Sequence, residues 1–189
     1  MTRVTAGRID HALAFTEAVL GDVDEIVDMV NRAYSRAPGA PGWAGERSFQ
    51  PGDRTDALEV SRFVAEPLTT VLVGRRDGRL VSCCCVTGRD DATAYLGLFA
   101  VDPDRQSGGL GRATMAAGES VAVMAFEAQR IVVEVMEHHE PLREWYLRLG
   151  YWPTGSRSVF PGSIAAEPVW LVEMDKALAP IKSTPLARS

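Results

Sequence analysis

The segment with the clearest chemistry is residues 106–112, where three glycines follow a predicted buried strand and precede a predicted helix. These glycines are Gly108, Gly109 and Gly111. Glycine lets the backbone take a positive φ and approach a ligand closely. The first turn of a helix carries unpaired N–H groups and the positive end of the helix dipole, which together bind phosphate. Because Arg105 and Arg112 add local positive charge, the segment predicts a site for a phosphorylated ligand.

A dinucleotide-binding loop is one alternative for the same glycines. Such a loop needs G-x-G-x-x-G directly after a strand and an acidic residue about 20 positions further on. Gly109 and Gly111 supply two glycines and Glu134 stands where the acid belongs, but Thr114 replaces the third glycine. Pro103 also lies in a linker that separates the strand from the glycines. These departures count against a dinucleotide site, and a loop that only turns the chain is the second alternative.

Three consecutive cysteines at residues 83–85 lie in a predicted strand. Neighbouring side chains of a strand point to opposite faces, so the three thiols cannot together close a tetrahedral metal site. Their odd, clustered number also argues against a disulfide framework. We therefore expect small buried apolar residues here, and no metal site.

Two motifs, in order, resemble the GNAT N-acetyltransferase superfamily. The first is Q-x-x-G-x-G at residues 106–111, preceded by Val-Asp-Pro at 101–103, and it is similar to the acyl-CoA pyrophosphate loop of that family. The second is EWYLRLGY at residues 144–151, which resembles the family's later aromatic-rich helix with its Gly-aromatic end. A predicted strand at residues 131–135 lies between them, as in that family. The resemblance covers most of the chain and implies a small, single-domain, bacterial-type acyl-CoA-dependent N-acyltransferase.

The resemblance implies acetyl-CoA as the acyl donor, inserted where two parallel strands at residues 94–101 and 131–136 splay apart. Backbone groups of the first strand then pair with the pantetheine, and amides of the glycine loop hold the pyrophosphate. Where the later motif usually has an Asn, this chain has His139, for which a solvated loop histidine is the other interpretation. The residues assigned to the cofactor are Phe99, Ala100, Val101, Gln106, Ser107, Gly108, Gly109, Leu110, Gly111, Arg112 and His139.

The resemblance also assigns Tyr146 as the proton donor to the departing thiolate. An alkyl ammonium has a pKa of ~10.4, so presenting it as a neutral amine at pH 7 costs roughly 4–5 kcal/mol and requires a proton acceptor. Proton transfer from a tyrosine of pKa ~10 to a thiolate of pKa ~8.5 is uphill by only ~2 kcal/mol. A positioned hydrogen bond offsets that difference. A packed core aromatic is the other interpretation of Tyr146.

The proton acceptor and the acceptor pocket rest on a further resemblance. Some relatives carry a Glu on the strand before the glycine loop, where this chain has Tyr95. Residues 42–54, GWAGERSFQPGDR, resemble a Gly-Trp-x-x-Glu…Gly-x-Arg pattern of some small bacterial members. We therefore expect Glu46, or a chain of water molecules, to accept the proton. We expect Trp43, Arg54 and Tyr95 to bind the substrate. In the other interpretation, Trp43 only fixes the loop to the core and the charged residues of the loop are solvated.

Hydrophobic periodicity predicts the elements that position these residues. Predicted strands cover residues 12–19, 69–75, 80–87, 94–101, 131–136 and 169–174. Predicted helices cover residues 22–34, with Asp22 as the N-cap, 55–65, 109–128 and 141–149. An Asp-Gly pair at residues 77–78 predicts a tight hairpin. The order predicts an α/β (mixed α+β) class: a GNAT fold with a largely antiparallel sheet, one splayed parallel pair, and helices on both faces.

Composition excludes several classes of protein. A chain of 189 residues with 46% hydrophobic and 24% charged residues is typical of one globular domain. No apolar stretch reaches the ~18–20 residues of a membrane span, and no secretory signal pattern is visible. A net charge of -5 argues against a broad nucleic-acid-binding surface. Reduced, buried cysteines fit a cytoplasmic location.

These observations divide the chain into a flexible N-terminus at residues 1–10, one acetyltransferase domain at 11–177 and a tail at 178–189. The expected partners are acetyl-CoA and an amine acceptor, without nucleic acid or membrane, and the resemblance also allows a homodimer. A catalytically silent acyl-CoA-binding sensor or partner module with the same fold is the alternative function.

Overall fold

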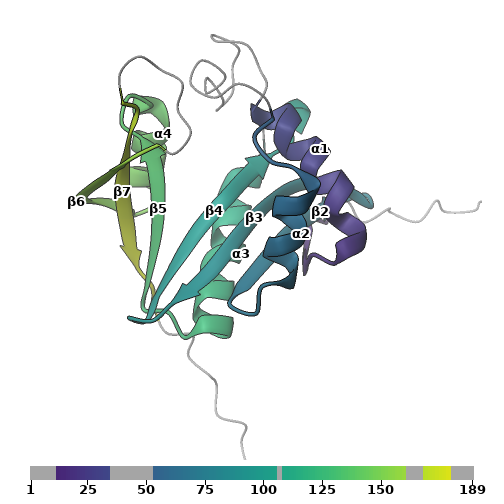
Figure 1. The fold of residues 1–189 in the computed structure, drawn as a ribbon, viewed down its shortest axis with the longest axis horizontal. Helices are drawn as coiled ribbons and strands as arrows, with labels where there is room; N and C mark the ends of the chain where they lie inside the picture. Colours follow the sequence, from purple (N-terminus) through teal and green to yellow (C-terminus); the bar gives the residue numbers. More distant parts are fainter. Residues whose placement is uncertain (1–11, 35–52, 106–107, 161–167, 180–189) are drawn as a thin grey trace, which may run out of the picture.

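A computed structural model of the chain describes residues 12–34, 53–105, 108–160 and 168–179. Within these ranges, seven strands form one sheet, accompanied by four α-helices and two short 3₁₀ helices (Figure 1). The strands are β1 (Ala14–Glu17), β2 (Thr69–Arg76), β3 (Arg79–Arg89), β4 (Thr93–Val101), β5 (Arg130–Met136), β6 (Trp152–Val159) and β7 (Trp170–Ala177). The helices are η1 (Leu20–Asp22), α1 (Val23–Tyr34), α2 (Ala57–Ala65), η3 (Pro103–Arg105), α3 (Leu110–Phe126) and α4 (Glu140–Arg148).

The strands lie in the order β1-β2-β3-β4-β5-β7-β6. Neighbouring strands are antiparallel except for β4 and β5, which run parallel. The turn between β2 and β3 contains Asp77 and Gly78, whose φ angles of 55° and 74° are those that a tight hairpin turn requires. The predicted mixed, largely antiparallel sheet with one parallel pair is therefore confirmed.

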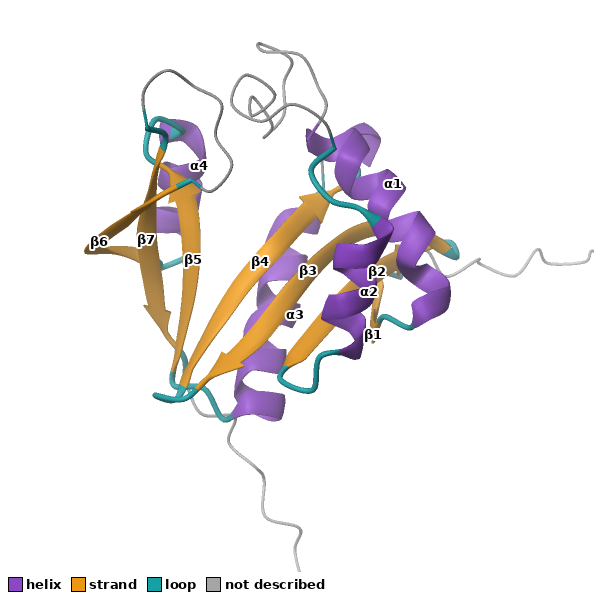
Figure 2. Cartoon of the chain, in the orientation of Figure 1, coloured by secondary structure: helices purple, strands orange, loops and turns teal. Residues whose placement is uncertain are grey.

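Helices cover both faces of the sheet (Figure 2). Helices α1 and α2 pack with one apolar cluster, and α3 and α4 pack with the other. The cysteines of β3 separate the two clusters, because Cys84 belongs to the α3 side whereas Cys83 and Cys85 belong to the α1 side. All three thiols are buried and unbridged, as the sequence predicts. Among the described residues, no group of His, Cys, Asp or Glu side chains is arranged to hold a metal ion.

The four helices begin one or two residues away from their predicted starts, and the reason is clear for α1 and α2. Asp22 does not begin α1 as its N-cap; it ends η1, where its carboxylate accepts a hydrogen bond from the Val19 N–H at 2.9 Å. The same carboxylate lies 2.8 Å from the Arg75 guanidinium, which fixes η1 against β2. Helix α2 begins two residues later than predicted, after Asp56, whose carboxylate caps it by accepting from the Glu59 N–H at 2.8 Å.

One strand, β6, is absent from the sequence prediction. All of its residues are exposed, so it lacks the alternation of buried and exposed positions that marks a strand. It contains Pro153 and also Gly155, whose φ is 89°. Because β6 lies at the edge of the sheet and pairs only with β7, a proline is tolerated there.

None of the helices in the described part of the chain is both long enough and apolar enough to cross a membrane.

Candidate active site

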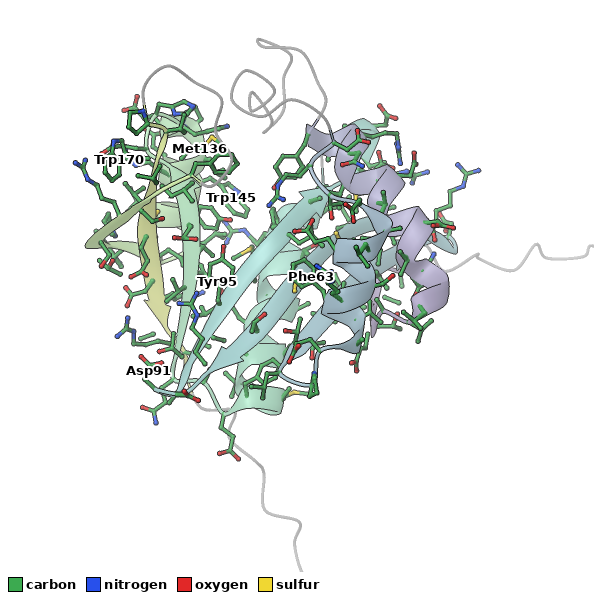
Figure 3. All side chains as sticks on the ribbon, in the orientation of Figure 1. Phe63, Asp91, Tyr95, Met136, Trp145 and Trp170 are labelled. Atoms are coloured by element: carbon green, nitrogen blue, oxygen red, sulfur yellow. The ribbon has the colours of Figure 1, made fainter. Side chains whose placement is uncertain are left out.

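The parallel strands β4 and β5 separate after a short paired segment. They pair only over residues 93–95 of β4 and 130–132 of β5, and then diverge (Figure 3). Tyr95 lies near the point where they part, and Trp145, from α4, lies toward the open end of the gap (Figure 3). The predicted splayed pair is thus present.

A bulge in β4 accompanies the separation. The pairing with β3 passes from Cys85–Gly97 to Cys83–Ala100, so β4 has one more residue than β3 between these pairs. Leu98 lies in this extra segment and has a φ of 43°. A bulge bends its strand and increases the local twist, which directs the end of β4 away from β5.

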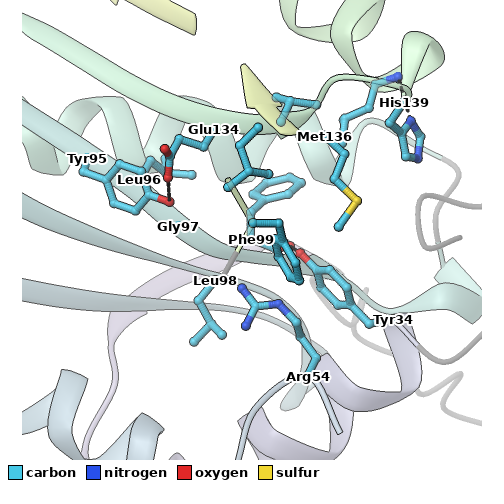
Figure 4. A pocket seen from close by; sticks show the side chains of 14 residues that line it. Tyr34, Arg54, Tyr95, Leu96, Gly97, Leu98, Phe99, Glu134, Met136 and His139 are labelled. Carbon is cyan, nitrogen blue, oxygen red and sulfur yellow. Dashed lines mark hydrogen bonds between the residues drawn. The ribbon is translucent and has the colours of Figure 1, made fainter. Parts of the chain in front are cut away.

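A cavity of about 110 Å³ lies between the separated parts of β4 and β5 (Figure 4). That volume equals roughly four molecules of liquid water, so the cavity accommodates a group of a few non-hydrogen atoms. Most of its lining comes from apolar side chains and backbone of the two strands. Its polar side chains are Tyr34, Arg54, Tyr95, Glu134 and His139.

Helix α3 begins with two glycines in left-handed conformations. Gly108 has a φ of 91° and Gly109 a φ of 79°, and a Cβ added at either position would meet nothing within 4 Å. Glycine is therefore required here for backbone conformation and not for space. The first helical hydrogen bond runs from the Ala113 N–H to the Gly109 carbonyl at 2.9 Å. The preceding amides of the first turn have no intrahelical acceptor and are suited to an anionic ligand.

The start of α3 lies against the open end of the cavity. A Cβ on Gly111 would lie 3.4 Å from the Trp145 indole and 3.7 Å from the Phe99 ring. The Phe99 and Trp145 rings are themselves 5.9 Å apart between centroids. Since Phe99 also lines the cavity, the end of β4, the first turn of α3 and helix α4 converge at this point.

Tyr146 lies in α4, beside this convergence, and is 5% exposed. Its ring makes edge-on contacts with Trp145 at 5.0 Å and with Tyr151 at 5.4 Å between centroids. Burial raises the pKa of the Tyr146 hydroxyl well above its ordinary value, and the Tyr34 and Tyr95 hydroxyls add to that rise. The hydroxyl therefore keeps its proton at any physiological pH and acts as a hydrogen-bond donor.

Glu134 is the carboxylate of the cavity. It accepts a hydrogen bond from the Tyr95 hydroxyl at 3.3 Å, across the gap between β5 and β4 (Figure 4). Its other oxygen accepts from the Ser158 hydroxyl of β6 at 3.0 Å. Burial raises the pKa of Tyr95 to about 12, and the Glu134 charge and hydrogen bond add to the rise, while the charges of Arg54 and Arg89 oppose it.

The sequence prediction overlooked Glu134 as an acid or base and considered it only for the dinucleotide alternative. A signal was present, because Glu134 is the sole charged residue inside the apolar run IVVEVM at residues 131–136. It is also the exposed residue between the buried Val133 and Val135. A carboxylate within such a strand is unusual unless its face of the strand is open to solvent or a ligand.

A family model for the acetyltransferase (GNAT) family matches residues 27–151, which is more than half of the chain. The chain belongs to the GNAT acetyltransferase family. No curated protein sequence matches this GNAT chain significantly.

Solved structures share the fold at low sequence identity. The ribosomal-protein-S18-alanine N-acetyltransferase of Escherichia coli has a TM-score of 0.67 and 15% identity, over 94% of this chain and 100% of that one. The structure of yncA from Salmonella typhimurium with its cofactor acetyl-CoA has a TM-score of 0.65 and 17% identity, over 91% and 97%. The paia N-acetyltransferase of Thermoplasma acidophilum, in complex with coenzyme A, has a TM-score of 0.66 and 9% identity, over 88% and 99%. These similarities confirm the GNAT fold of the chain.

The structure brings several of the predicted site residues of this GNAT chain together. Tyr95, Phe99, Arg54 and His139 line one cavity, and Tyr146 lies in the helix next to it. Four predicted residues lie outside the described part of the chain: Trp43, Glu46, Gln106 and Ser107. Their predicted roles remain predictions.

His139 also has a structural contact. Its Nδ1 accepts a hydrogen bond from the Leu142 N–H at 3.3 Å and thereby caps α4. The cap orients the imidazole at the edge of the cavity, and its predicted contact with the cofactor remains a prediction.

Proposed function

We propose that this GNAT chain is an acyl-CoA-dependent N-acyltransferase that transfers an acetyl group from acetyl-CoA to an amine by direct attack. The observation that carries the proposal is the position of Glu134, a carboxylate in the cavity between the splayed strands. The open end of that cavity meets the first turn of α3, which is suited to a phosphate. One cleft therefore combines an anion-binding helix start with a proton acceptor.

Donor binding uses the backbone of β4 and of the loop before α3. Among the described residues, β4 has no strand partner on its β5 side beyond Tyr95, so the backbone of residues 99–101 is available to an extended pantetheine. The Tyr34 hydroxyl donates to the Phe99 carbonyl at 3.0 Å, which leaves that carbonyl its second lone pair. The pyrophosphate lies on the amides of residues 106–112, and His139 contacts the cofactor from the other side.

Glu134 accepts the proton of the acceptor ammonium in this proposal. At pH 7 a neutral alkyl amine lies roughly 4–5 kcal/mol above its ammonium, and a base that takes up the proton as the N–C bond forms lowers this contribution to the barrier. The neutral nitrogen then attacks the acetyl carbon, so that an N–C bond forms as the C–S bond breaks, and the nitrogen gives its second proton to solvent to leave the neutral amide. Two hydroxyls, from Tyr95 and Ser158, hold the carboxylate in place.

Tyr146 stabilises the departing thiolate. Burial raises the pKa of its hydroxyl, so the proton stays on the oxygen until negative charge develops on the sulfur. Tyr146 then donates its hydrogen bond and its proton to the departing thiolate, and solvent restores that proton. Hydrogen-bond donors aimed at a developing charge commonly contribute 10²-fold or more to the rate.

The test measures thiol release from acetyl-CoA over a panel of primary amines, with isothermal titration of CoA in parallel. We expect saturable CoA binding and amine-dependent thiol release above the hydrolysis background. Binding without amine-dependent release would replace the enzyme by a silent acyl-CoA-binding module. No binding of CoA would refute both functions.

We also propose that residues 11–177 form the catalytic domain and that the protein works in the cytoplasm, in keeping with three buried reduced thiols. A homodimer is proposed through β6, an edge strand with exposed Trp152 and Val159. Light scattering on the purified protein distinguishes a dimer from a monomer.

A further inference from the structure

The cavity that holds Glu134 also holds an opposite charge. Among the described residues that line it, Arg54 is the one side chain with a permanent positive charge and Glu134 is the one carboxylate. Arg54 precedes α2, whereas Glu134 lies in β5, so two distant segments of the chain bring these charges to one small space (Figure 4).

The Arg54 side chain is oriented by an aromatic contact. Its guanidinium lies over the Tyr34 ring, 5.4 Å from the centroid. Tyr34 is in turn fixed by its hydrogen bond to the Phe99 carbonyl. The guanidinium is a planar fork of N–H donors whose geometry matches a carboxylate. Figure 4 shows the Arg54 guanidinium pointing into the cavity.

The two charges act on the same group. The Tyr95 hydroxyl donates to Glu134, and the Arg54 charge opposes the rise that Glu134 causes in the pKa of Tyr95. Both charges are therefore within electrostatic reach of one hydroxyl. The cavity that both side chains line has a volume of about 110 Å³, which accommodates a group of a few non-hydrogen atoms.

We propose that the acceptor is a small amino-acid-type compound, with its amine directed at Glu134 and its carboxylate bound by Arg54. This inference rests on the proposed function. The anionic group is unchanged in the reaction. The ammonium loses one proton to Glu134, its nitrogen bonds to the acetyl carbon and gives its second proton to solvent, and the C–S bond breaks to release CoA. Acetylation removes the positive charge of the amine, so the product loses its attraction to Glu134 and dissociates.

The experiment compares acceptors that share a carbon skeleton but differ in charge. For phenylalanine, methionine, glutamate and alanine, the kcat/KM of thiol release is measured for the free amino acid, its carboxamide and the decarboxylated amine. The wild-type enzyme is expected to prefer at least one amino acid over its carboxamide by 10-fold to 100-fold, the range of a charge-assisted hydrogen bond. In Arg54→Met, that ratio falls to about one, mainly through KM. Arg54→Lys retains part of the ratio, because it keeps the charge but not the fork.

Arg62 supplies the matched control. It lies in α2 and lines a neighbouring groove rather than the cavity, so Arg62→Met leaves the ratio unchanged. Thermal unfolding of each variant checks that the fold is intact. Equal use of amino acids, carboxamides and amines would overturn the inference and leave the proposed function standing, as would an unchanged ratio in Arg54→Met. Thiol release with none of these amines, nor with any wider panel, would instead overturn the proposed function.

Discussion

Replacing Glu134 by Gln removes the proposed proton acceptor and keeps the shape of the side chain and its ability to accept a hydrogen bond from Tyr95. With an acceptor amine of pKa ~10.4, only about one molecule in 2,500 is neutral at pH 7. Without a base, the enzyme depends on that fraction. We therefore expect kcat/KM at pH 7 to fall by 10²-fold to 10⁴-fold, the range of general base catalysis.

The pH profile separates a base from a merely structural residue. In Glu134→Gln, kcat/KM should rise about 10-fold per pH unit, or ~100-fold between pH 7 and pH 9, because the neutral amine fraction rises by that factor. The wild-type profile should be shallower, so the two profiles converge as pH increases. The assay is thiol release under subsaturating amine at each pH, with CoA affinity checked by isothermal titration.

Glu137 provides the matched control for this substitution. It follows β5 directly, is paired with Arg157 at 3.3 Å and does not line the cavity. Glu137→Gln should keep both the rate and the pH profile of the wild type. A constant ratio of kcat/KM between wild type and Glu134→Gln from pH 7 to pH 9 would show that Glu134 positions other groups and is not the base. A kcat/KM of Glu134→Gln within three-fold of wild type would exclude Glu134 from the mechanism.

Three further predictions concern the donor side and the core. Tyr146→Phe keeps the ring contacts with Trp145 and Tyr151 but removes the hydroxyl that donates to the sulfur. We expect kcat to fall at least 10²-fold while CoA affinity changes less than two-fold. An unchanged kcat would exclude that role for Tyr146. Gly109→Asp forces a side chain onto a residue with a φ of 79° and directs a negative charge at the phosphates, so titration should detect no CoA binding. The control Gly155→Asp makes the same change at a φ of 89° on β6 and should bind CoA normally. Wild-type affinity in Gly109→Asp would refute the loop assignment. Burial raises the pKa of Cys83 from 9.0 to about 12 and of Cys85 to about 11, so the native state holds these protons more tightly than the unfolded state. The stabilisation is complete below pH 9 and is lost as pH rises. Urea titrations should show the free energy of unfolding falling by about 1.4 kcal/mol per thiol between pH 7 and pH 10. In Cys83→Val, the total fall should be smaller by about 1.4 kcal/mol, because one thiol is absent. An equal loss in Cys83→Val would contradict this assignment.

The sequence predicts those elements whose signal is local. The helix predicted at residues 22–34 and the Asp-Gly turn after β2 each depend on a few neighbouring residues, and the structure confirms both elements. Strand β6 has no buried face, so no periodicity marks it, and only its pairing with β7 makes it a strand. The proposed phosphate loop can be predicted because glycine spacing is a local property of the sequence.

The acceptor side of the site was less predictable because it depends on contacts between distant segments. The separation of β4 from β5 was predicted only from the family resemblance, and that separation is what makes the Glu134 carboxylate accessible. Arg54 was predicted to bind the substrate, but its stacking on Tyr34 arises only from the packing of α1 beside the segment that precedes α2. The presence of Arg54 and Glu134 in one cavity therefore depends on tertiary contacts between distant segments.

Three positions of β4 explain why the cavity has this form. Tyr95 and Gly97 lie on the same face of the strand, and a Cβ on Gly97 would lie 2.9 Å from the Tyr95 ring. Only glycine lets that ring lie along the strand, from where its hydroxyl reaches Glu134 on β5. The next residue, Leu98, takes a left-handed φ that a non-glycine residue adopts at a cost of about 1–2 kcal/mol. That cost is offset by buried packing, including the Cys83 thiol near the Leu98 carbonyl at 3.5 Å, so the bulge that opens the cavity is held by the apolar strand behind it.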